Sequence, residues 1–240
     1  HITKLTEKGK YDGAILSTYS KSEIDELDEY IDHSRDMDLA YAATQQMIGK
    51  YLLQDRVTKR LYESPQMLFM LVAMTGFISY PKETRLHYVK RMYDSLSKFE
   101  VSLPTPIMGG LRTPTKQYSS CVKIDCDDSL DSINASANAI VNYISQRAGI
   151  GINAGAIRAL GSPIRNGEAV HTGVIPFYKH FQSAVKSCSQ GALRGGAATL
   201  FYPIWHREVE SLLVLKNNRG VEDNRVRHLD YGVQINKLIY

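Results

Sequence analysis

The first hundred residues carry apolar side chains at helical spacing. Ser20 and Glu23 form the pattern of a capping box, after which Ile24, Leu27 and Ile31 recur on one face while acidic residues occupy the other. The same spacing predicts further helices over residues 37–52, over the apolar stretch after position 65, and over residues 82–99. Residues 1–100 are therefore expected to form a helical segment.

The pattern changes near residue 101, where prolines and a glycine pair divide the chain into short pieces. Residues 118–126 then alternate as a strand does. Asp128 can cap a helix over residues 128–147 whose apolar stripe recurs every three or four positions, and Gly149 fits its end. Further helices are predicted over 176–187 and 208–215, separated by glycine-rich stretches at 149–173 and 190–196. This alternation predicts an α/β domain over residues 101–240.

Composition adds few constraints. The chain has 240 residues, 43% of them hydrophobic and 22% charged, and its net charge of +4 is dispersed, which does not indicate a nucleic-acid partner. The longest apolar run, at 67–74, is far shorter than the roughly 18 residues of a membrane helix, and the N-terminus lacks a signal pattern. We therefore expect a cytoplasmic protein with no membrane contact. Because its first residue is His rather than Met, the chain is either processed or a fragment.

Two glycine-rich runs are open to more than one interpretation. The run from Gly149 to Ala154, GIGINA, matches a relaxed dinucleotide fingerprint, but it follows a predicted helix instead of a strand, so an irregular loop after a helix end is the better interpretation. The run SQGALRGG offers one guanidinium, Arg194, in a loop that lacks the GK[ST] ending of a phosphate-binding loop. Its spacing alone does not decide between recognition of a ligand and simple solubility.

The three cysteines show no metal-binding or disulfide-scaffold spacing, so reduced thiols and no bound metal are expected. Cys121 and Cys126 lie five positions apart near the predicted strand and should face opposite sides of it. A single strand cysteine is more often a small buried hydrophobe than a redox group. No HExxH motif and no Ser/His/Asp arrangement supports a hydrolase or a metalloenzyme.

Resemblance to a known family resolves these alternatives. The ordered segments SLPTPIMGGLRTPTKQYSSC, DSLDSINA, SQRAGIGINAGAIRALGSPIRNGEAVHTG, KSCSQGALRGGAATLFYP and LVLKNNRGVEDNRVRHLDYGVQINK resemble the large, catalytic subunit of class I ribonucleotide reductases. The resemblance runs from about Gly9 to the last residue. It implies an α/β fold in which an N-terminal helical segment precedes the first part of a ten-stranded α/β barrel.

The resemblance also implies a chemistry. In this family a thiyl radical removes a ribose hydrogen, the 2′-hydroxyl leaves as water, and a cysteine pair supplies two electrons by becoming a disulfide. Cys121 matches one member of that pair. Thr105 matches a contact to the substrate phosphates, Ser120 lies beside the ribose, and Ala148 with Gly149 matches backbone that approaches the substrate.

The family's specificity-effector site, which binds a deoxynucleoside triphosphate or ATP, maps onto five residues: Asp128, Ser129, Leu130, Arg158 and Arg165. An Asp accepting from a deoxyribose hydroxyl, a helix N-terminus and two guanidiniums suit such a ligand. Gln190 and Arg194 match the loop that relays effector identity to substrate choice. The helices at 128–147 and 82–99 correspond to those through which the family self-associates.

The chain ends before the family's radical cysteine, second redox cysteine and C-terminal tail, and it lacks the N-terminal ATP-cone. We therefore expect one piece of a split large subunit, inactive alone. It would need a complementary C-terminal large-subunit chain, a small subunit that holds the metal-radical cofactor, and a thioredoxin or glutaredoxin-type reductant. The alternative is a catalytically inactive nucleotide-sensing dimerisation module. This alternative would be favoured if no second chain carried the radical cysteine.

Overall fold

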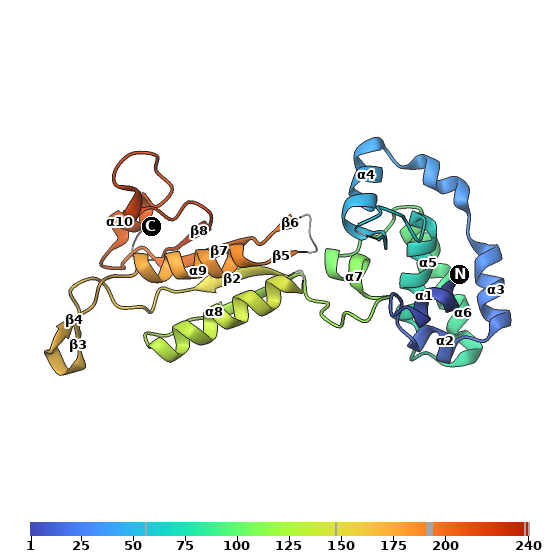
Figure 1. Cartoon of the computed structure of the whole chain (residues 1–240), viewed down its shortest axis with the longest axis horizontal. Helices are drawn as coiled ribbons and strands as arrows, with labels where there is room; N and C mark the ends of the chain where they lie inside the picture. Colours follow the sequence, from blue (N-terminus) through green and yellow to red (C-terminus); the bar gives the residue numbers. More distant parts are fainter. Residues whose placement is uncertain (56, 147, 191–193, 238, 240) are drawn as a thin grey trace. The chain divides into compact units, whose positions relative to one another are not determined.

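The computed structural model describes residues 1–55, 57–146, 148–190, 194–237 and 239. The chain forms two compact units, His1–Tyr118 and Ser119–Tyr240 (Figure 1). The boundary between the units lies after Tyr118, later in the chain than the change near residue 100 from helical spacing to Pro- and Gly-rich segments. Its physical reason is burial, because Met108 packs in the core of the first unit and Arg112 is fully buried there.

The first unit, here called the helical unit, is built around one apolar helix. In chain order its helices are α1 (Ile2–Glu7), α2 (Ala14–Thr18), α3 (Lys21–Tyr30), η1 (His33–Asp38), α4 (Tyr41–Gln46), η2 (Met47–Tyr51), α5 (Pro65–Gly76), α6 (Lys82–Ser97) and α7 (Thr105–Gly110). Helix α5 is buried on nearly every side, and α6 packs along it. The predicted capping box of α3 is confirmed, with Ser20 and Glu23 each accepting from the other's backbone N–H.

The prediction of one continuous helix over residues 37–52 is wrong. The chain is extended at Leu39 and Ala40, α4 begins only at Tyr41, and it continues into the π-helical turn η2. Met47 and Leu52 are buried in the core of the unit. Tertiary packing therefore overrides the helical propensity of this segment.

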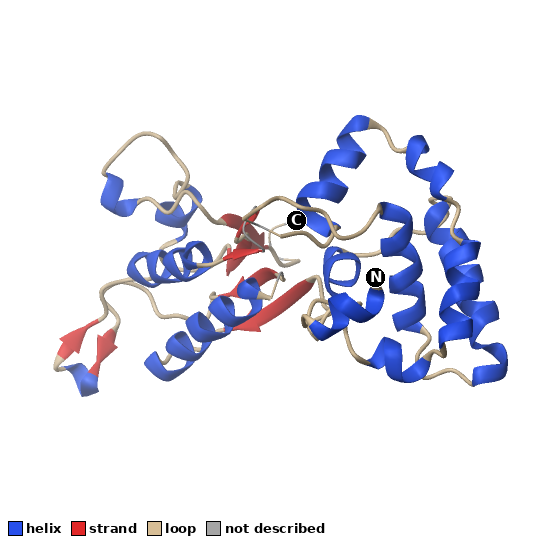
Figure 2. Ribbon diagram, turned by 45° about the vertical axis from the view of Figure 1, so that its right-hand side comes forward, coloured by secondary structure: helices blue, strands red, loops and turns tan. Residues whose placement is uncertain are grey.

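The second unit, here called the sheet unit, contains a four-stranded parallel sheet in the order β1-β2-β7-β8 (Figure 2). Its strands are β1 (Cys121–Asp125), β2 (Gly149–Asn153), β7 (Ala198–Pro203) and β8 (Asp230–Gln234). Helices α8 (Leu130–Ser145) and α9 (Ile175–Ser187) pack their apolar stripes against one face of the sheet, where Ile150, Ile152 and Leu200 are buried. Parallel strands joined through helices are the pattern of the first part of an α/β barrel.

The rest of the sheet unit consists of short elements around this sheet. A hairpin of β3 (Pro163–Ile164) and β4 (Ala169–Val170) encloses the turn η3 (Arg165–Gly167), and a second hairpin pairs β5 (Ser189–Gln190) with β6 (Arg194–Gly195). Helix α10 (Val209–Leu213) and the turn η4 (Glu222–Asn224) lie between β7 and β8 in the chain. Among the residues that the structure describes, no helix is both long and apolar enough to span a bilayer.

Two local predictions at the ends of α8 need correction. The residue that caps α8 is Ser129, whose hydroxyl accepts from the Ser132 N–H at 3.1 Å, whereas the Asp128 carboxylate turns to Arg158. The helix ends at Ser145, and the predicted end at Arg147 falls outside the described residues. Gly149 opens strand β2 rather than an irregular loop, because Ile150 and Ile152 alternate with small residues and bury themselves under the helices.

Candidate functional site

The face of the sheet away from α8 and α9 is open. A hollow of about 590 Å³ lies over it, lined by residues of all four strands, among them Cys121, Lys123, Gly149, Asn153 and Phe201. The ring of Phe201 on β7 lies against Gly232, its register partner on β8, since a Cβ there would come within 2.3 Å of the ring. A glycine at that position therefore lets the ring cover the strand.

Cys121 stands at the start of β1 on this open face. Its side chain is exposed, and its partner in the strand register is Gly149. A Cβ at Gly149 would lie 3.9 Å from the Cys121 sulfur, so the missing side chain leaves space beside the thiol. Cys126 is buried beneath the helices, and burial raises the pKa of its thiol. The two cysteines differ in exposure as the strand pattern predicts.

Two of the predicted substrate residues, Ser120 and Gly149, lie beside Cys121. The Gly149 N–H donates to the Ser120 carbonyl at 2.8 Å, and the Ser120 hydroxyl lies 3.9 Å from the Cys121 sulfur. Ala148, directly before Gly149, is fully buried. Thr105 belongs to the helical unit, at the start of α7, where its hydroxyl lies 3.5 Å from that of Tyr51.

A second hollow, of about 420 Å³, opens at the N-terminus of α8. All five residues predicted for the effector site line it: Asp128, Ser129, Leu130, Arg158 and Arg165. The sequence separates these residues by up to 37 positions, and the fold brings them to one place. We call this hollow the α8 pocket.

The charges of the α8 pocket are arranged around Arg158. Its Nε donates to one oxygen of Asp128 at 2.6 Å and its backbone N–H to the other at 3.0 Å. The pair is about one-third exposed, which leaves it accessible to a ligand. Arg165 lies at the tip of the β3–β4 hairpin with a positive φ of 51°, and no ion pair holds its guanidinium among the described residues.

The α8 pocket also contains residues that the sequence analysis missed. His171 and Phe177 stack with ring centroids 5.5 Å apart, and Thr172 and Val170 complete that wall. A planar aromatic wall next to two guanidiniums suits a flat, charged ligand. The only sequence signal was the HTG triplet that follows the hairpin, and no local spacing connects it with Asp128.

Gln190 and Arg194 pair as backbone partners in the β5–β6 hairpin. The predicted recognition loop runs from Gln190 to Gly196, and its residues 191–193 lie outside the described residues. The hairpin directly precedes β7, whose first residue, Ala198, borders the open-face hollow.

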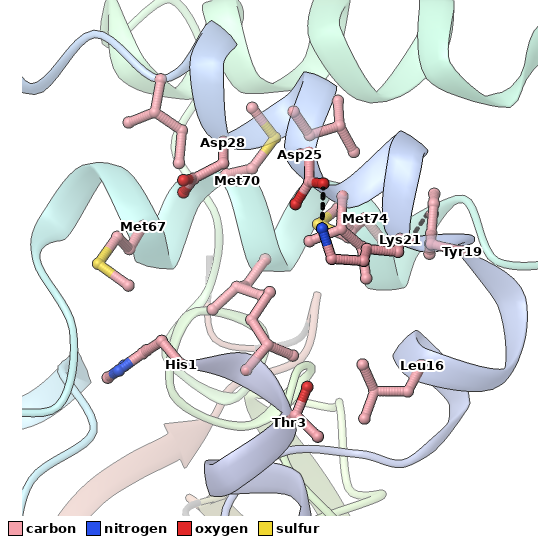
Figure 3. A pocket seen from close by; sticks show the side chains of 15 residues that line it. His1, Thr3, Leu16, Tyr19, Lys21, Asp25, Asp28, Met67, Met70 and Met74 are labelled. Atoms are coloured by element: carbon pink, nitrogen blue, oxygen red, sulfur yellow. Dashed lines mark hydrogen bonds and ion pairs between the residues drawn. The ribbon is translucent and has the colours of Figure 1, made fainter.

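The helical unit has a cavity of its own, of about 570 Å³. Figure 3 shows Met67, Met70 and Met74 of α5 around it, with the Lys21–Asp25 ion pair on α3 at its edge. No residue predicted for a site lines this cavity. The cavity therefore lies between the apolar helix α5 and the helices α1, α2 and α3.

Comparison with known proteins identifies the class. The family model described as the ribonucleotide reductase all-alpha domain matches residues 37–116, and the model of the ribonucleotide reductase barrel domain matches residues 119–240. The chain therefore belongs to the ribonucleotide reductase family, with the barrel domain beginning where the sheet unit begins.

Within this family, the chain is similar to subunits alpha of ribonucleoside-diphosphate reductases. The chain is 70% identical over all 240 residues to ribonucleoside-diphosphate reductase 1 subunit alpha of Escherichia coli strain K12, and 70% identical to the subunit alpha of Haemophilus influenzae. It is 58% identical over 239 residues to the subunit alpha of enterobacteria phage T4. In each comparison the chain spans 32% of the relative's length.

Proposed function

We propose that this chain is part of the large subunit of a ribonucleoside-diphosphate reductase, to which it contributes one redox cysteine and the specificity-effector site. The observation that carries the proposal is the open-face hollow, where an exposed thiol stands beside a strand position without a side chain. A thiol held on a strand gives the fixed geometry that a reaction between positioned groups requires. The membership of the family and the 70% identity to subunits alpha support the assignment.

In this proposal Cys121 is a reductant. Cys121 and a second cysteine from the remainder of the barrel give up two electrons and two protons and become a disulfide. At the ribose the C2′–O bond breaks and the hydroxyl leaves as water with one proton, while the two electrons and the other proton form the new C2′–H bond. Ser120, Ala148 and Gly149 shape the place of the ribose, and Thr105 binds the substrate phosphates. The radical that starts the reaction arises at a metal centre in a separate small subunit, and no residue of this chain is assigned to hold a metal.

The α8 pocket is the proposed site for a deoxynucleoside triphosphate or ATP. Arg158 and Arg165 would hold phosphates together with the first N–H groups of α8, and Asp128 would accept from the sugar hydroxyl. Gln190 and Arg194 would report the bound base to the substrate site. The predicted helices at 128–147 and 82–99, which are α8 and α6 in the structure, would take part in self-association.

Reconstitution tests the function. The purified chain, the remainder of the barrel, the small subunit and a dithiol reductant are combined, and reduction of a ribonucleoside diphosphate is measured with each component left out in turn. We expect turnover only from the complete mixture, here called the assembled reductase. Turnover by this chain alone would contradict the proposal. Binding of dTTP without any turnover in the complete mixture would favour a nucleotide-sensing dimerisation module.

A further inference from the structure

We propose that His206 and Glu208, in the connection between β7 and α10, are positioning residues that fix the loop carrying Arg158 and Arg165 in the α8 pocket. The inference rests on the proposed effector site, and it concerns two residues that do not line that pocket. They contact backbone N–H and carbonyl groups of the loop and not the pocket itself.

His206 holds the loop on one side of Arg158. Its imidazole is buried, and Nε2 lies 3.0 Å from the Ile157 carbonyl while Nδ1 accepts from the Glu208 N–H at 3.1 Å. A carbonyl only accepts and an N–H only donates, so the two contacts together require a proton on Nε2 and none on Nδ1. One ring thereby joins Ile157 to the chain at Glu208.

Glu208 holds the loop on the other side of Arg158 and again at its end. One carboxylate oxygen, Oε2, accepts from the Leu160 N–H at 2.9 Å and from the Val174 N–H at 3.1 Å. Leu160 precedes the β3–β4 hairpin and Val174 follows it, so a single carboxylate ties both ends of the segment that carries Arg165.

The Glu208 carboxylate also packs closely against the backbone of Gly173. The φ of Gly173 is +92°, and a Cβ there would lie 2.7 Å from the other carboxylate oxygen, Oε1. Any other residue would push the carboxylate away from Val174. Arg158 is therefore fixed by contacts at Ile157 and Leu160, and its own N–H by Asp128. The Arg158 guanidinium itself donates to Asp128 and to the Pro163 carbonyl, so the part proposed for His206 and Glu208 is to hold the backbone on both sides of Arg158 and at both ends of the segment that carries Arg165.

The test is calorimetric titration of the assembled reductase with dTTP, with thermal unfolding measured on the same samples. Glu208→Ala removes both acceptor contacts, and we expect dTTP affinity to fall about tenfold. Glu208→Asp keeps the charge but shortens the side chain by one methylene, so the carboxylate no longer reaches both N–H groups. The dTTP affinity of this variant should fall by a similar factor. Glu208→Gln keeps one oxygen for both N–H groups and should stay within about twofold of the parent, which corresponds to a small part of one hydrogen bond.

Two further variants separate positioning from general loosening of the fold. His206→Gln offers one acceptor and one donor in place of the two ring nitrogens, so it should bind dTTP better than His206→Leu. Ile140→Val trims a fully buried side chain in the middle of α8, away from the pocket. It should lower the unfolding temperature and leave dTTP affinity unchanged. Weakening by Ile140→Val equal to that of Glu208→Asp would overturn the inference.

Arg158→Ala, titrated in the same series, distinguishes this inference from the proposed function. If Arg158→Ala loses affinity while Glu208→Ala and Glu208→Asp bind normally, the positioning role is wrong and the effector site stands. If Arg158→Ala also binds dTTP normally, the effector site itself is wrong, and the positioning role falls with it.

Discussion

Two arginine–carboxylate pairs show how differently the two units use the same chemistry. In the helical unit, the side chains of Glu63 and Arg112 are both fully buried, and Arg112 donates to one oxygen of Glu63 through Nε at 2.9 Å and to the other through a terminal guanidinium nitrogen. The rest of their hydrogen bonds go to Tyr11, the Leu53 N–H, and the carbonyls of Met108 and Tyr51. In the sheet unit, Asp128 and Arg158 are about one-third exposed at the edge of the α8 pocket.

The difference in burial decides what each pair can do. A buried pair whose charged groups are hydrogen-bonded within the protein fixes the packing around it. Burial beside Glu63 also raises the pKa of the Tyr11 phenol, so that hydroxyl stays protonated and donates to Glu63. An accessible pair adds little to stability and can exchange partners with a ligand. The cores of the two units differ in the same way, since the helical unit buries α5 on nearly every side whereas the sheet unit leaves one face of its sheet open.

The largest effect is expected at the open face. Cys121→Ser in the assembled reductase should abolish multiple-turnover reduction, because the thiol is one of the two reductants, and should leave dTTP binding intact. Turnover assays and dTTP titration of the same preparation check this. Cys126→Ser is the matched control, since that thiol is buried under the helices and should have a mild effect. Equal loss from both substitutions would mean that Cys121 is not the reductant.

The next effect is on stability and belongs to the helical unit. Arg112→Ala leaves the Glu63 carboxylate buried without its partner and should lower the free energy of unfolding by about 3–5 kcal/mol. Asp128→Ala breaks the accessible pair and should cost at most about 1 kcal/mol. Urea unfolding of the two variants side by side measures the difference. Equal costs would remove the contrast between the two pairs.

A smaller effect is expected on ligand affinity. Arg158→Ala should weaken dTTP binding by about tenfold to a hundredfold, because it removes one charge-assisted partner of the triphosphate. The affinity of the parent should fall as salt is added, and the variant should depend less on salt. Titration at two ionic strengths measures both. A salt dependence that is unchanged in the variant would argue against phosphate contact by Arg158.

The smallest effect on affinity is expected in the β5–β6 hairpin. Arg194→Ala should leave dTTP affinity nearly unchanged and blur the dependence of substrate preference on the effector, because this residue is proposed to read the base. Competition assays with mixed ribonucleoside diphosphates, run with dTTP and with dGTP, measure that dependence. Loss of dTTP binding in Arg194→Ala together with normal binding in Arg158→Ala would reverse the two proposed roles.

The sequence by itself determined the elements whose signals are local. The capping box at Ser20 and Glu23 and the apolar stripe of α8 could be identified because helix caps and side-chain periodicity act over a few residues. Five residues of the α8 pocket could be named from the family resemblance, whereas their spacing alone would not have grouped them, and His171 and Phe177 were missed. The identity of the family was also carried by the sequence, through long ordered segments.

Only the tertiary structure decided which residues meet. The break at Leu39 and the strand at Gly149 depend on what each segment packs against, since burial of a few apolar side chains outweighs local propensity. The contacts of Glu208 with Leu160 and Val174 join positions 48 and 34 residues away in the chain. No periodicity records such contacts, because they form only when the parallel strands bring distant loops to one edge of the sheet.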